Sequence, residues 1–372
     1  MNTKVKQTIE SIHEACGHIA KEWAATSNDI YAFPEVAMKF TEGLDLSVFA
    51  DVANLHAVLA KPEIAKLQAP ASFSDLYYVL FDNREFYVEV LNWWGSDINV
   101  HDHDFSGVQI QVLDSSLNVE YSFDEAELID GVAVGRVGLA RAELWPQGAR
   151  SRVVPGMPHN VSHLAEPTVS ILFRTHPNPN FGPQRNYFAP EIAATYPVHD
   201  VVWRKKAQML RLLATATDKS RFAKAFRAVT DSQTANENLF TLIKMVDLVF
   251  AHDVVACVHE FAARDELCAK IVDAAAFYRA NELLAKGLKY RAGTSADEVI
   301  CASALSAAFD FASFDKIDSD LRAAGYKLDL WATLDDMRRR LEGREARTLA
   351  TLIDLFGLDI RRPSPSAGVT IH

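Results

Sequence analysis

The stretch FYVEVLNWWGSDINVHDHDFSGVQIQVL, residues 86–113, decides the fold. Its apolar and aromatic runs are short, and Asn, Asp and Gly interrupt them, as is typical of strands joined by turns. In a strand, residues i and i+2 point to the same side, so His101 and His103 are predicted to project together. Two neighbouring neutral imidazoles form half of a compact metal site.

The chain around this stretch is also predicted to be β-rich. Between Ser74 and Thr175, runs such as DLYYVLF, GVAVGRVGLARAELW and TVSILFR are separated by turn residues, with no helical pattern between them. This pattern predicts an antiparallel sandwich or barrel. Apolar residues recur at steps of three and four before and after it, which predicts helices. We therefore expect an N-terminal helical segment (1–70), a β-barrel (71–195) and a C-terminal helical domain (196–372).

The second half of the predicted metal site lies in VVPGMPHNVSH, residues 153–163. Gly156 and Pro158 predict a tight turn that presents His159 from a later, antiparallel strand. His163 follows the same turn with the same strand parity and is the alternative third ligand. Three converging imidazoles suit a divalent first-row metal and leave coordination positions open.

Together the two motifs resemble those of the cupin superfamily. Its first motif, glycine, five residues and H-x-H, is met by Gly95, His101 and His103, and its second, a Pro/Gly turn and G-x-x-H, by Gly156 and His159. FYVEVLNWWGSDINVHDH and NVSHLAEPTVS are similar to the thiol dioxygenase branch, which includes cysteine dioxygenase. This resemblance spans residues 74–178 and the helical stretch before them. It implies an all-β double-stranded β-helix barrel.

The chain departs from the family pattern in two informative places. Many cupins have a glutamate four or five residues after the second histidine, where this chain has Gly107 and Val108. Thiol dioxygenases lack that glutamate too, which leaves three neutral histidine ligands. Their Ser–His–Tyr network should fall on TVSILFR, where Ser170 fits but Leu172 and Arg174 replace histidine and tyrosine. Arg174 is predicted either to bind an anion in the pocket or to lie on the surface at a strand end.

The resemblance implies a mononuclear non-haem iron oxygenase in which His101, His103 and His159 hold Fe(II). A dication held by uncharged ligands attracts a small, anionic, chelating substrate, such as a thiol or diketone, and leaves a position for O2. One alternative is a sensor or assembly module whose helical domain is the working surface. Another is an isomerase or lyase using Zn(II) or Ni(II), although no general base is evident near the ligands. Many cupins pair through their barrels, so a homo-oligomer is compatible with all three.

Several side chains are candidates for the walls of the pocket. Phe105, Val108, Ile110, Trp93 and Trp94 are expected to line it or pack behind it. For Tyr78 and Tyr187, structural roles are favoured over pocket roles.

The composition of the chain limits the classes of partner that the protein is expected to bind. Lys and Arg number 38 and Asp and Glu 49, a formal net charge of −11, which disfavours a nucleic-acid partner. Four scattered cysteines indicate reduced thiols, and neither a signal-like segment nor an apolar run of about 20 residues is found, so we expect a cytoplasmic protein with no membrane partner.

Two other histidine motifs carry no predicted site. HEACGH, residues 13–18, spaces its histidines by five rather than the four of a zinc-protease helix. A looser cluster, His252, Cys257, His259 and Glu260, does not share one helix face and is expected to be packing.

Overall fold

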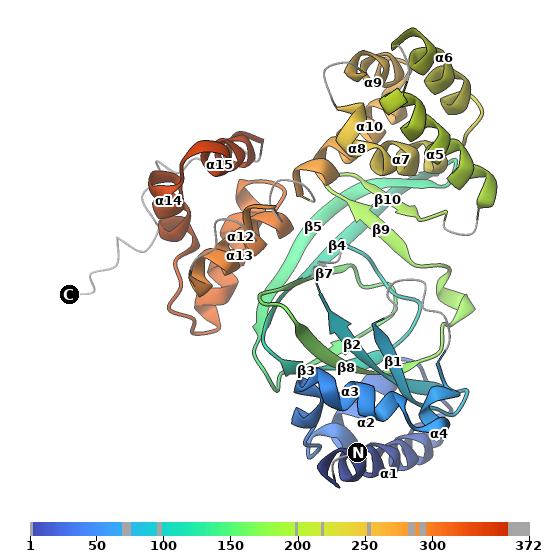
Figure 1. The fold of residues 1–372 in the computed structure, drawn as a ribbon, viewed down its shortest axis with the longest axis vertical. Coiled ribbons are helices and arrows are strands. Elements are labelled where there is room, and N and C mark those ends of the chain that lie inside the picture. The colour runs from blue at the N-terminus through green and yellow to red at the C-terminus, as the bar shows by residue number, and fades with distance from the viewer. Residues whose placement is uncertain are drawn as a thin grey trace.

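A computed structural model describes residues 3–68, 76–94, 99–197, 200–216, 219–250, 254–281, 287–289 and 295–355. A β region occupies the middle of the molecule, with the N-terminal helices against one side and two further groups of helices elsewhere on it (Figure 1). The predicted antiparallel β region between helical segments is therefore confirmed. Within the described residues, no helix is both long and apolar enough to cross a membrane.

The β region consists of two five-stranded sheets, and neighbouring strands of the described residues run antiparallel. Sheet A has the order β1-β2-β8-β3-β6 and sheet B the order β7-β4-β5-β10-β9. The bounds of the strands are β1 Tyr77–Asp82, β2 Phe86–Trp93, β3 Gly107–Leu113, β4 Ser116–Ile129, β5 Val132–Trp145, β6 Arg150–Val153, β7 His159–His163, β8 Thr168–Thr175, β9 Arg185–Phe188 and β10 Ile192–Thr195.

The N-terminal helices cover one face of sheet A. They are α1 Thr3–Ala25, α2 Phe33–Thr41, a 3-10 turn Ser47–Ala50, α3 Val52–Leu59 and α4 Pro62–Ala65. Ile12 and Phe33 from these helices share one apolar cluster with Val88, Val108 and Phe173 of the sheet, and all five are fully buried. Burying one such side chain is worth about 1.5–3 kcal/mol, so this contact is a main source of stability.

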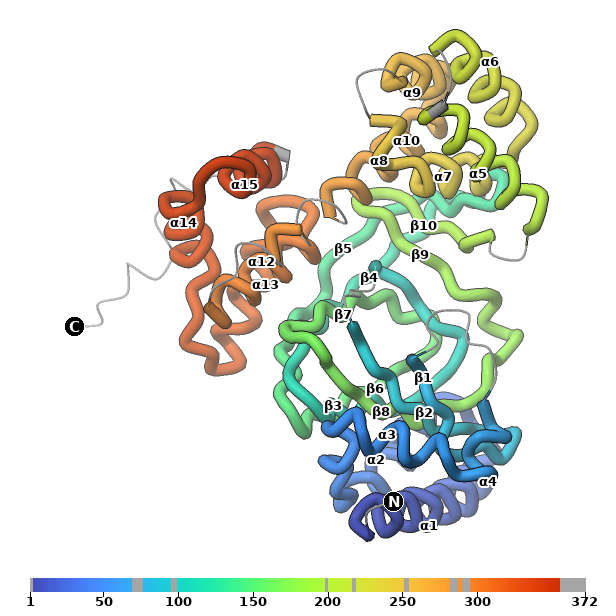
Figure 2. Tube along the Cα trace, in the orientation of Figure 1, coloured from blue at the N-terminus to red at the C-terminus, as the bar shows by residue number. Residues whose placement is uncertain are grey.

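The C-terminal helices pack on sheet B. Its strands β4 and β5 are each 14 residues long and pair along their length, and the tube in Figure 2 follows them from the β region to the first helical group. That group contains α5 Val201–Ala216, α6 Lys219–Thr230, α7 Ala235–Lys244, α8 Val246–Val249, α9 Val255–Ala262 and α10 Glu266–Arg279. It shares a core with β10 and with the end of β9, centred on the buried Trp203.

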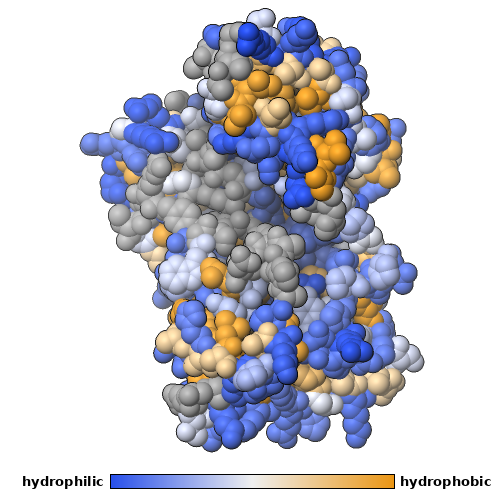
Figure 3. Space-filling model, turned by 45° about the vertical axis from the view of Figure 1, so that its right-hand side comes forward, coloured by the Kyte–Doolittle hydropathy of each residue, from blue (hydrophilic) through white to orange (hydrophobic). Residues whose placement is uncertain are grey.

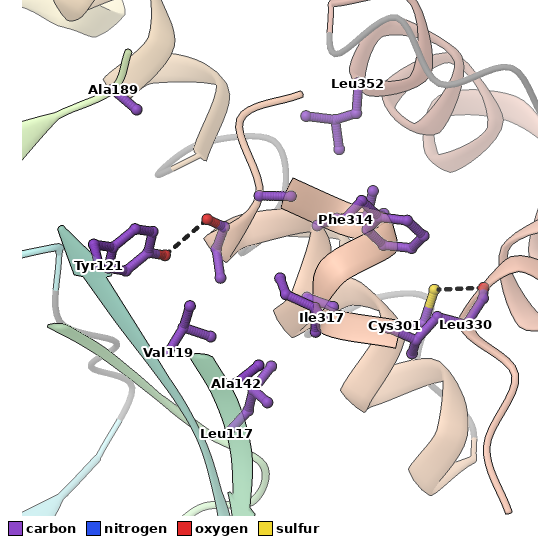
Figure 4. Close-up of a cluster of buried hydrophobic side chains, with 14 of the residues drawn as sticks. Leu117, Val119, Tyr121, Ala142, Ala189, Cys301, Phe314, Ile317, Leu330 and Leu352 are labelled. Atoms are coloured by element: carbon purple, nitrogen blue, oxygen red, sulfur yellow. Dashed lines mark hydrogen bonds between the residues drawn. The ribbon is translucent and has the colours of Figure 1, made fainter. Parts of the chain in front are cut away.

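The second helical group packs elsewhere on sheet B. It contains α12 Ala296–Ala307, α13 Phe311–Ala323, α14 Leu330–Arg340 and α15 Gly343–Leu355. Its core includes Phe314 and Ile317 and meets Val119 and Tyr121 of β4 (Figure 4). The Tyr121 hydroxyl donates a hydrogen bond of 2.7 Å to the carbonyl oxygen of Ala307. The C-terminal helices therefore form two groups, each with its own apolar core on sheet B.

The face of the molecule shown in Figure 3 is mainly hydrophilic, and its apolar residues form separate patches.

The segment HEACGH and the cluster His252, Cys257, His259 and Glu260 contribute packing and surface residues where they are described. His13 interacts with the Leu80 carbonyl oxygen, His18 stacks on Phe40, and Cys257 is buried, while His252 lies outside the described residues.

Candidate metal centre

Two segments far apart in the sequence bring three histidines together. The backbone amides of His101 and His159 donate to each other's carbonyl oxygens at 3.0 and 2.8 Å, which places the two residues opposite each other. His103 follows two residues later, and its carbonyl oxygen accepts a hydrogen bond from the amide of Gly156. One potential ligand nitrogen from each of the three histidines lies within 4.8 Å of the other two. The turn at Gly156, with φ of +71°, is the one that the sequence predicts.

The ring nitrogens of this group suit a bound cation. Nδ1 of His101 lies 2.7 Å from the Asn99 carbonyl oxygen and Nδ1 of His159 lies 3.2 Å from that of Met157. A carbonyl oxygen only accepts, so each Nδ1 carries the proton and each Nε2 keeps a lone pair for a metal. Nδ1 of His103 is buried and has no hydrogen-bond partner among the described residues. A buried polar atom without a partner is costly, and coordination to a metal would remove that cost.

Burial keeps the three imidazoles uncharged. It lowers the pKa of His101 to about 3, assisted by the neighbouring His159, and lowers the pKa of His103 well below its usual value of 6.5. Burial also lowers the pKa of His159. Neutral imidazole is the form that binds a metal, so no proton competes with a cation here near neutral pH.

His163, the alternative third ligand, does not belong to this group. It is buried, its ring stacks on Trp93 with centroids 4.5 Å apart, and its Nδ1 lies 3.0 Å from the Ser116 hydroxyl. Within the described residues, the arrangement favours His159 over His163.

The three histidines lie on the wall of a cavity of about 510 Å³ between the two sheets. Strands of sheet A contribute half of the lining residues, sheet B contributes His159 and Val161, and the remainder come from the connecting segments. The lining residues are Leu67, Gln68, Tyr77, Val79, Asp82, Tyr87, Glu89, Leu91, Trp93, His101, His103, Asp104, Phe105, Gln109, Val153, His159, Val161, Leu172, Arg174, His176, Pro177 and Gln184. A cavity of this size accommodates a small molecule, and its wall is partly polar.

Arg174 faces the cavity and not the outer surface. Its guanidinium lies 3.2 Å from the ring centroid of Phe105 and 4.9 Å from that of Tyr87, and Phe105 in turn stacks on His103. Nη1 of Arg174 lies 3.4 Å from the carboxylate of Glu89, which is 8% exposed. Burial raises the pKa of Glu89, and Arg174 opposes that shift. The cavity thus contains a charged pair close to the histidines.

Ser170 is fully buried behind the cavity wall. Its hydroxyl accepts hydrogen bonds of 3.2 Å from Trp93 Nε1 and from Gln109 Nε2. Trp93 and Gln109 both line the cavity, whereas Ser170 does not. Ser170 therefore lies on the cavity side of sheet A beneath two wall residues that it orients, and it does not itself line the cavity.

The structure explains why no glutamate follows the H-x-H motif. A Cβ atom at Gly107 would lie 2.6 Å from the carbonyl oxygen of Phe173, closer than real contacts allow. Val108 is fully buried under the N-terminal helices, on the other face of the sheet. Neither position has room for a side chain that reaches the histidines, which leaves a set of three neutral ligands.

Of the five side chains expected to line the pocket or pack behind it, Trp94 alone needs correction. Trp93 and Phe105 line the cavity, but Val108 and Ile110 belong to the cluster beneath the N-terminal helices, because even-numbered residues of β3 point away from the cavity. Trp94 is 51% exposed.

The two tyrosines have the favoured structural roles. Tyr78 joins the cluster under the N-terminal helices, and the Tyr187 hydroxyl donates to Asp102 at 2.6 Å. Neither lines the cavity that holds the histidines.

Sequence reasoning missed several wall residues. Three residues of β2 point to the same side as Trp93 and line the cavity with it: Tyr87, Glu89 and Leu91. A charged residue in an otherwise apolar strand is unusual, and this was the signal in the sequence that could have identified Glu89. Gln109 similarly faces the cavity between two buried aliphatic residues of β3. Gln184 also lines the cavity, and the sequence offered no signal for it. Gly95 of the first motif lies outside the described residues.

Comparisons with known proteins give only weak likenesses. No protein-family model and no curated protein matches the chain. A conserved protein with a double-stranded β-helix domain from Klebsiella pneumoniae is 14% identical over 31% of this chain and 88% of that chain, with a TM-score of 0.20. Hydroquinone 1,2-dioxygenase from Sphingomonas sp. TTNP3 is 12% identical over 31% of this chain and 72% of that chain, with a TM-score of 0.23. DMSP lyase DddQ from Ruegeria pomeroyi is 15% identical over 30% of this chain and 54% of that chain, with a TM-score of 0.20. The chain therefore spans about half of the length of that lyase.

Proposed function

We propose that the chain is a mononuclear metal-dependent oxygenase of the cupin superfamily, similar to the thiol dioxygenases, with His101, His103 and His159 as ligands of Fe(II). One observation carries this proposal: three uncharged imidazoles, two of them buried and one partly buried, offer nitrogens within 4.8 Å of one another on the wall of a 510 Å³ cavity. Fe(II) held by three histidines would supply open positions that bring a chelating substrate and O2 together.

The surrounding residues support a small, anionic, chelating substrate. Because the three ligands are neutral, the site keeps the full charge of the cation and attracts a thiolate or diketonate. Arg174 is available to bind a further acidic group of the substrate, since its guanidinium faces the cavity from between two aromatic rings. Leu91, Trp93 and Leu172 form the apolar part of the wall and exclude water from the bound substrate.

Glu89 favours a second candidate function, a non-redox lyase or isomerase using Zn(II) or Ni(II). Its carboxylate lines the same cavity, and burial raises its pKa, which improves a carboxylate as a proton acceptor. The sequence alone offered no such base. In this alternative Glu89 would take a proton from the substrate while Arg174 holds an acidic group.

Anaerobic purification followed by metal analysis and O2-electrode assays across thiols and diketones tests the proposal. We expect one iron per chain and substrate-dependent O2 uptake, with both lost in His101→Ala and kept in His18→Ala, which removes an exposed histidine of α1. Turnover without O2 consumption would favour the lyase or isomerase. No metal, or metal without turnover of any substrate, would favour the sensor or assembly module.

A further inference from the structure

We propose that Asp102 is a positioning residue for the metal centre. Its buried carboxylate ties the segment carrying His101 and His103 to strand β9 and places a negative charge behind the neutral ligands. This inference rests on the proposed function, because it takes the three histidines as the ligands of a cation.

The contacts of Asp102 are short and come from one strand. Its side chain is 7% exposed, and Oδ1 accepts a hydrogen bond of 2.7 Å from the backbone amide of Arg185. Oδ2 accepts from the Tyr187 hydroxyl at 2.6 Å and from Arg185 Nε at 3.3 Å. The backbone amide of Asp102 donates to the Arg185 carbonyl oxygen at 3.1 Å. Asp102 lies between two cavity-lining histidines but does not itself line the cavity, so it acts from behind them.

The strand that holds Asp102 is anchored away from the cavity. β9 pairs with β10 over four residues, and the Tyr187 amide donates to the Val100 carbonyl oxygen at 2.9 Å. At the end of β9, Phe188 is buried in the core of the first C-terminal helical group, with its ring 5.8 Å from that of Phe240 in α7. The position of the H-x-H segment therefore depends on a strand that the C-terminal helices hold in place.

Charge gives Asp102 a second role. The three imidazoles contribute no negative charge to offset a dication. The Arg185 guanidinium is shared between Asp102 and Glu125, at 3.3 and 2.9 Å, so these three side chains together keep one negative charge. Asp102 stands between His101 and His103 in the sequence, so this charge lies close to a cation that the histidines would hold and would stabilise it.

Two conservative variants of the full chain test the inference. Asp102→Asn keeps an acceptor for the Arg185 amide but removes the charge, and Tyr187→Phe removes only the hydroxyl that donates to Asp102. The metal-free proteins are titrated with Zn(II) against a competing chelator, and Tm is measured without metal. Outer partners of metal ligands typically contribute about 10–100-fold in affinity, so we expect the Kd of Asp102→Asn to rise within that range and that of Tyr187→Phe by about tenfold.

Tyr121→Phe is the matched control. It also removes a buried tyrosine hydroxyl from sheet B, one that donates to Ala307 and not to the metal centre. We expect its Zn(II) Kd to equal that of the wild type. We also expect the effect of Tyr187→Phe on Kd to vanish in an Asp102→Asn background, which a general loss of stability would not produce.

The outcomes separate the two proposals. If the wild type binds no Zn(II) or Fe(II), the proposed function fails, and the positioning role fails with it. If the wild type binds metal and both variants bind it with unchanged Kd, the metal centre stands and only the role of Asp102 is overturned. Variants that lower Tm as Tyr121→Phe does, without weakening metal binding, also overturn it.

Discussion

The two faces of sheet A can be compared residue by residue, because neighbouring residues of one strand point to opposite sides. On β8, Phe173 is fully buried under the N-terminal helices, whereas Leu172 and Arg174 line the cavity. On β2, Val88 faces the helices and Glu89 faces the cavity. The helix-covered face is mainly apolar, apart from Arg150 and Arg152 of the edge strand β6, which contact α2. The cavity face mixes aromatic rings with a charged pair. One sheet therefore separates the residues that stabilise the fold from those available for chemistry.

The largest effect is expected on the helix-covered face. Phe173→Ala should lower the free energy of unfolding by about 3–5 kcal/mol, because it removes a fully buried ring and leaves a void. Its neighbour Leu172→Ala enlarges an existing cavity and should cost near the lower end of about 2–5 kcal/mol. Urea denaturation of both variants measures this difference. An equal or larger loss of stability in Leu172→Ala would contradict the conclusion that the helix-covered face stabilises the fold more than the cavity face does.

On the cavity face, Arg174→Gln should destabilise the protein in a pH-dependent manner. Burial already raises the pKa of Glu89, and loss of Arg174 raises it further. A carboxylate whose pKa is raised by folding opposes folding once the pH exceeds its unfolded-state pKa, near 4.5. We expect a loss of about 3 kcal/mol at pH 7 and little loss at pH 4.

The double variant Arg174→Gln, Glu89→Gln is the control for that prediction. It removes both charges and should recover part of the stability at pH 7. Denaturant curves at both pH values make the measurement. The same loss at pH 4 and pH 7 would show that the cost is packing rather than the unpaired carboxylate.

The histidines should make the metal-free protein less stable in acid. Burial lowers their pKa values, that of His101 to about 3, so the unfolded chain binds protons below pH 6.5 that the folded cavity does not bind. Stability is therefore lost as pH falls from 6.5 toward 3. His101 contributes about 2 kcal/mol between pH 7 and pH 5, because its pKa in the folded chain is about 3. His103→Gln should flatten this dependence, and an unchanged slope would argue against a neutral His103.

The smallest effect on stability is expected at Gly107, the first residue of strand β3. Gly107→Ala places a Cβ against the Phe173 carbonyl oxygen and should cost about 1–3 kcal/mol through overpacking. Gly43→Ala is the matched control, because a Cβ there would meet nothing within 4 Å. Thermal unfolding of the two variants compares them, and equal Tm values would contradict the close approach of β3 to β8.

The candidate ligands were predictable from sequence, whereas the wall around them was not. Strand parity indicates that His101 and His103 share a side, and the turn at Gly156 indicates which later histidine approaches them. Parity also groups alternate residues of β2 and β3, but it does not say which group faces the cavity. That choice depends on which face the N-terminal helices cover, a tertiary contact that no local pattern encodes. For this reason the sequence leaves open whether Val108 and Ile110 line the pocket or pack behind it.

Asp102 illustrates a second limit of sequence reasoning. As the middle residue of H-x-H it is expected to point away from the ligands, and a polar residue that points away is normally taken as solvated. Its burial depends on Arg185 and Tyr187, more than 80 residues later. Similarly, helical periodicity predicts the C-terminal helices from Val201 onward but not their division into two groups, because that division depends on which part of sheet B each group covers.

Metal stoichiometry tests the central claim most directly. The full chain, purified without O2 and dialysed against Fe(II), is compared with His103→Ala by elemental analysis, after circular dichroism has established that both are folded. We predict one tightly held metal ion per wild-type chain and none in the variant, because His103 contributes one of the three converging nitrogens. A folded wild type that retains no metal, or a variant that retains as much as the wild type, would contradict the account.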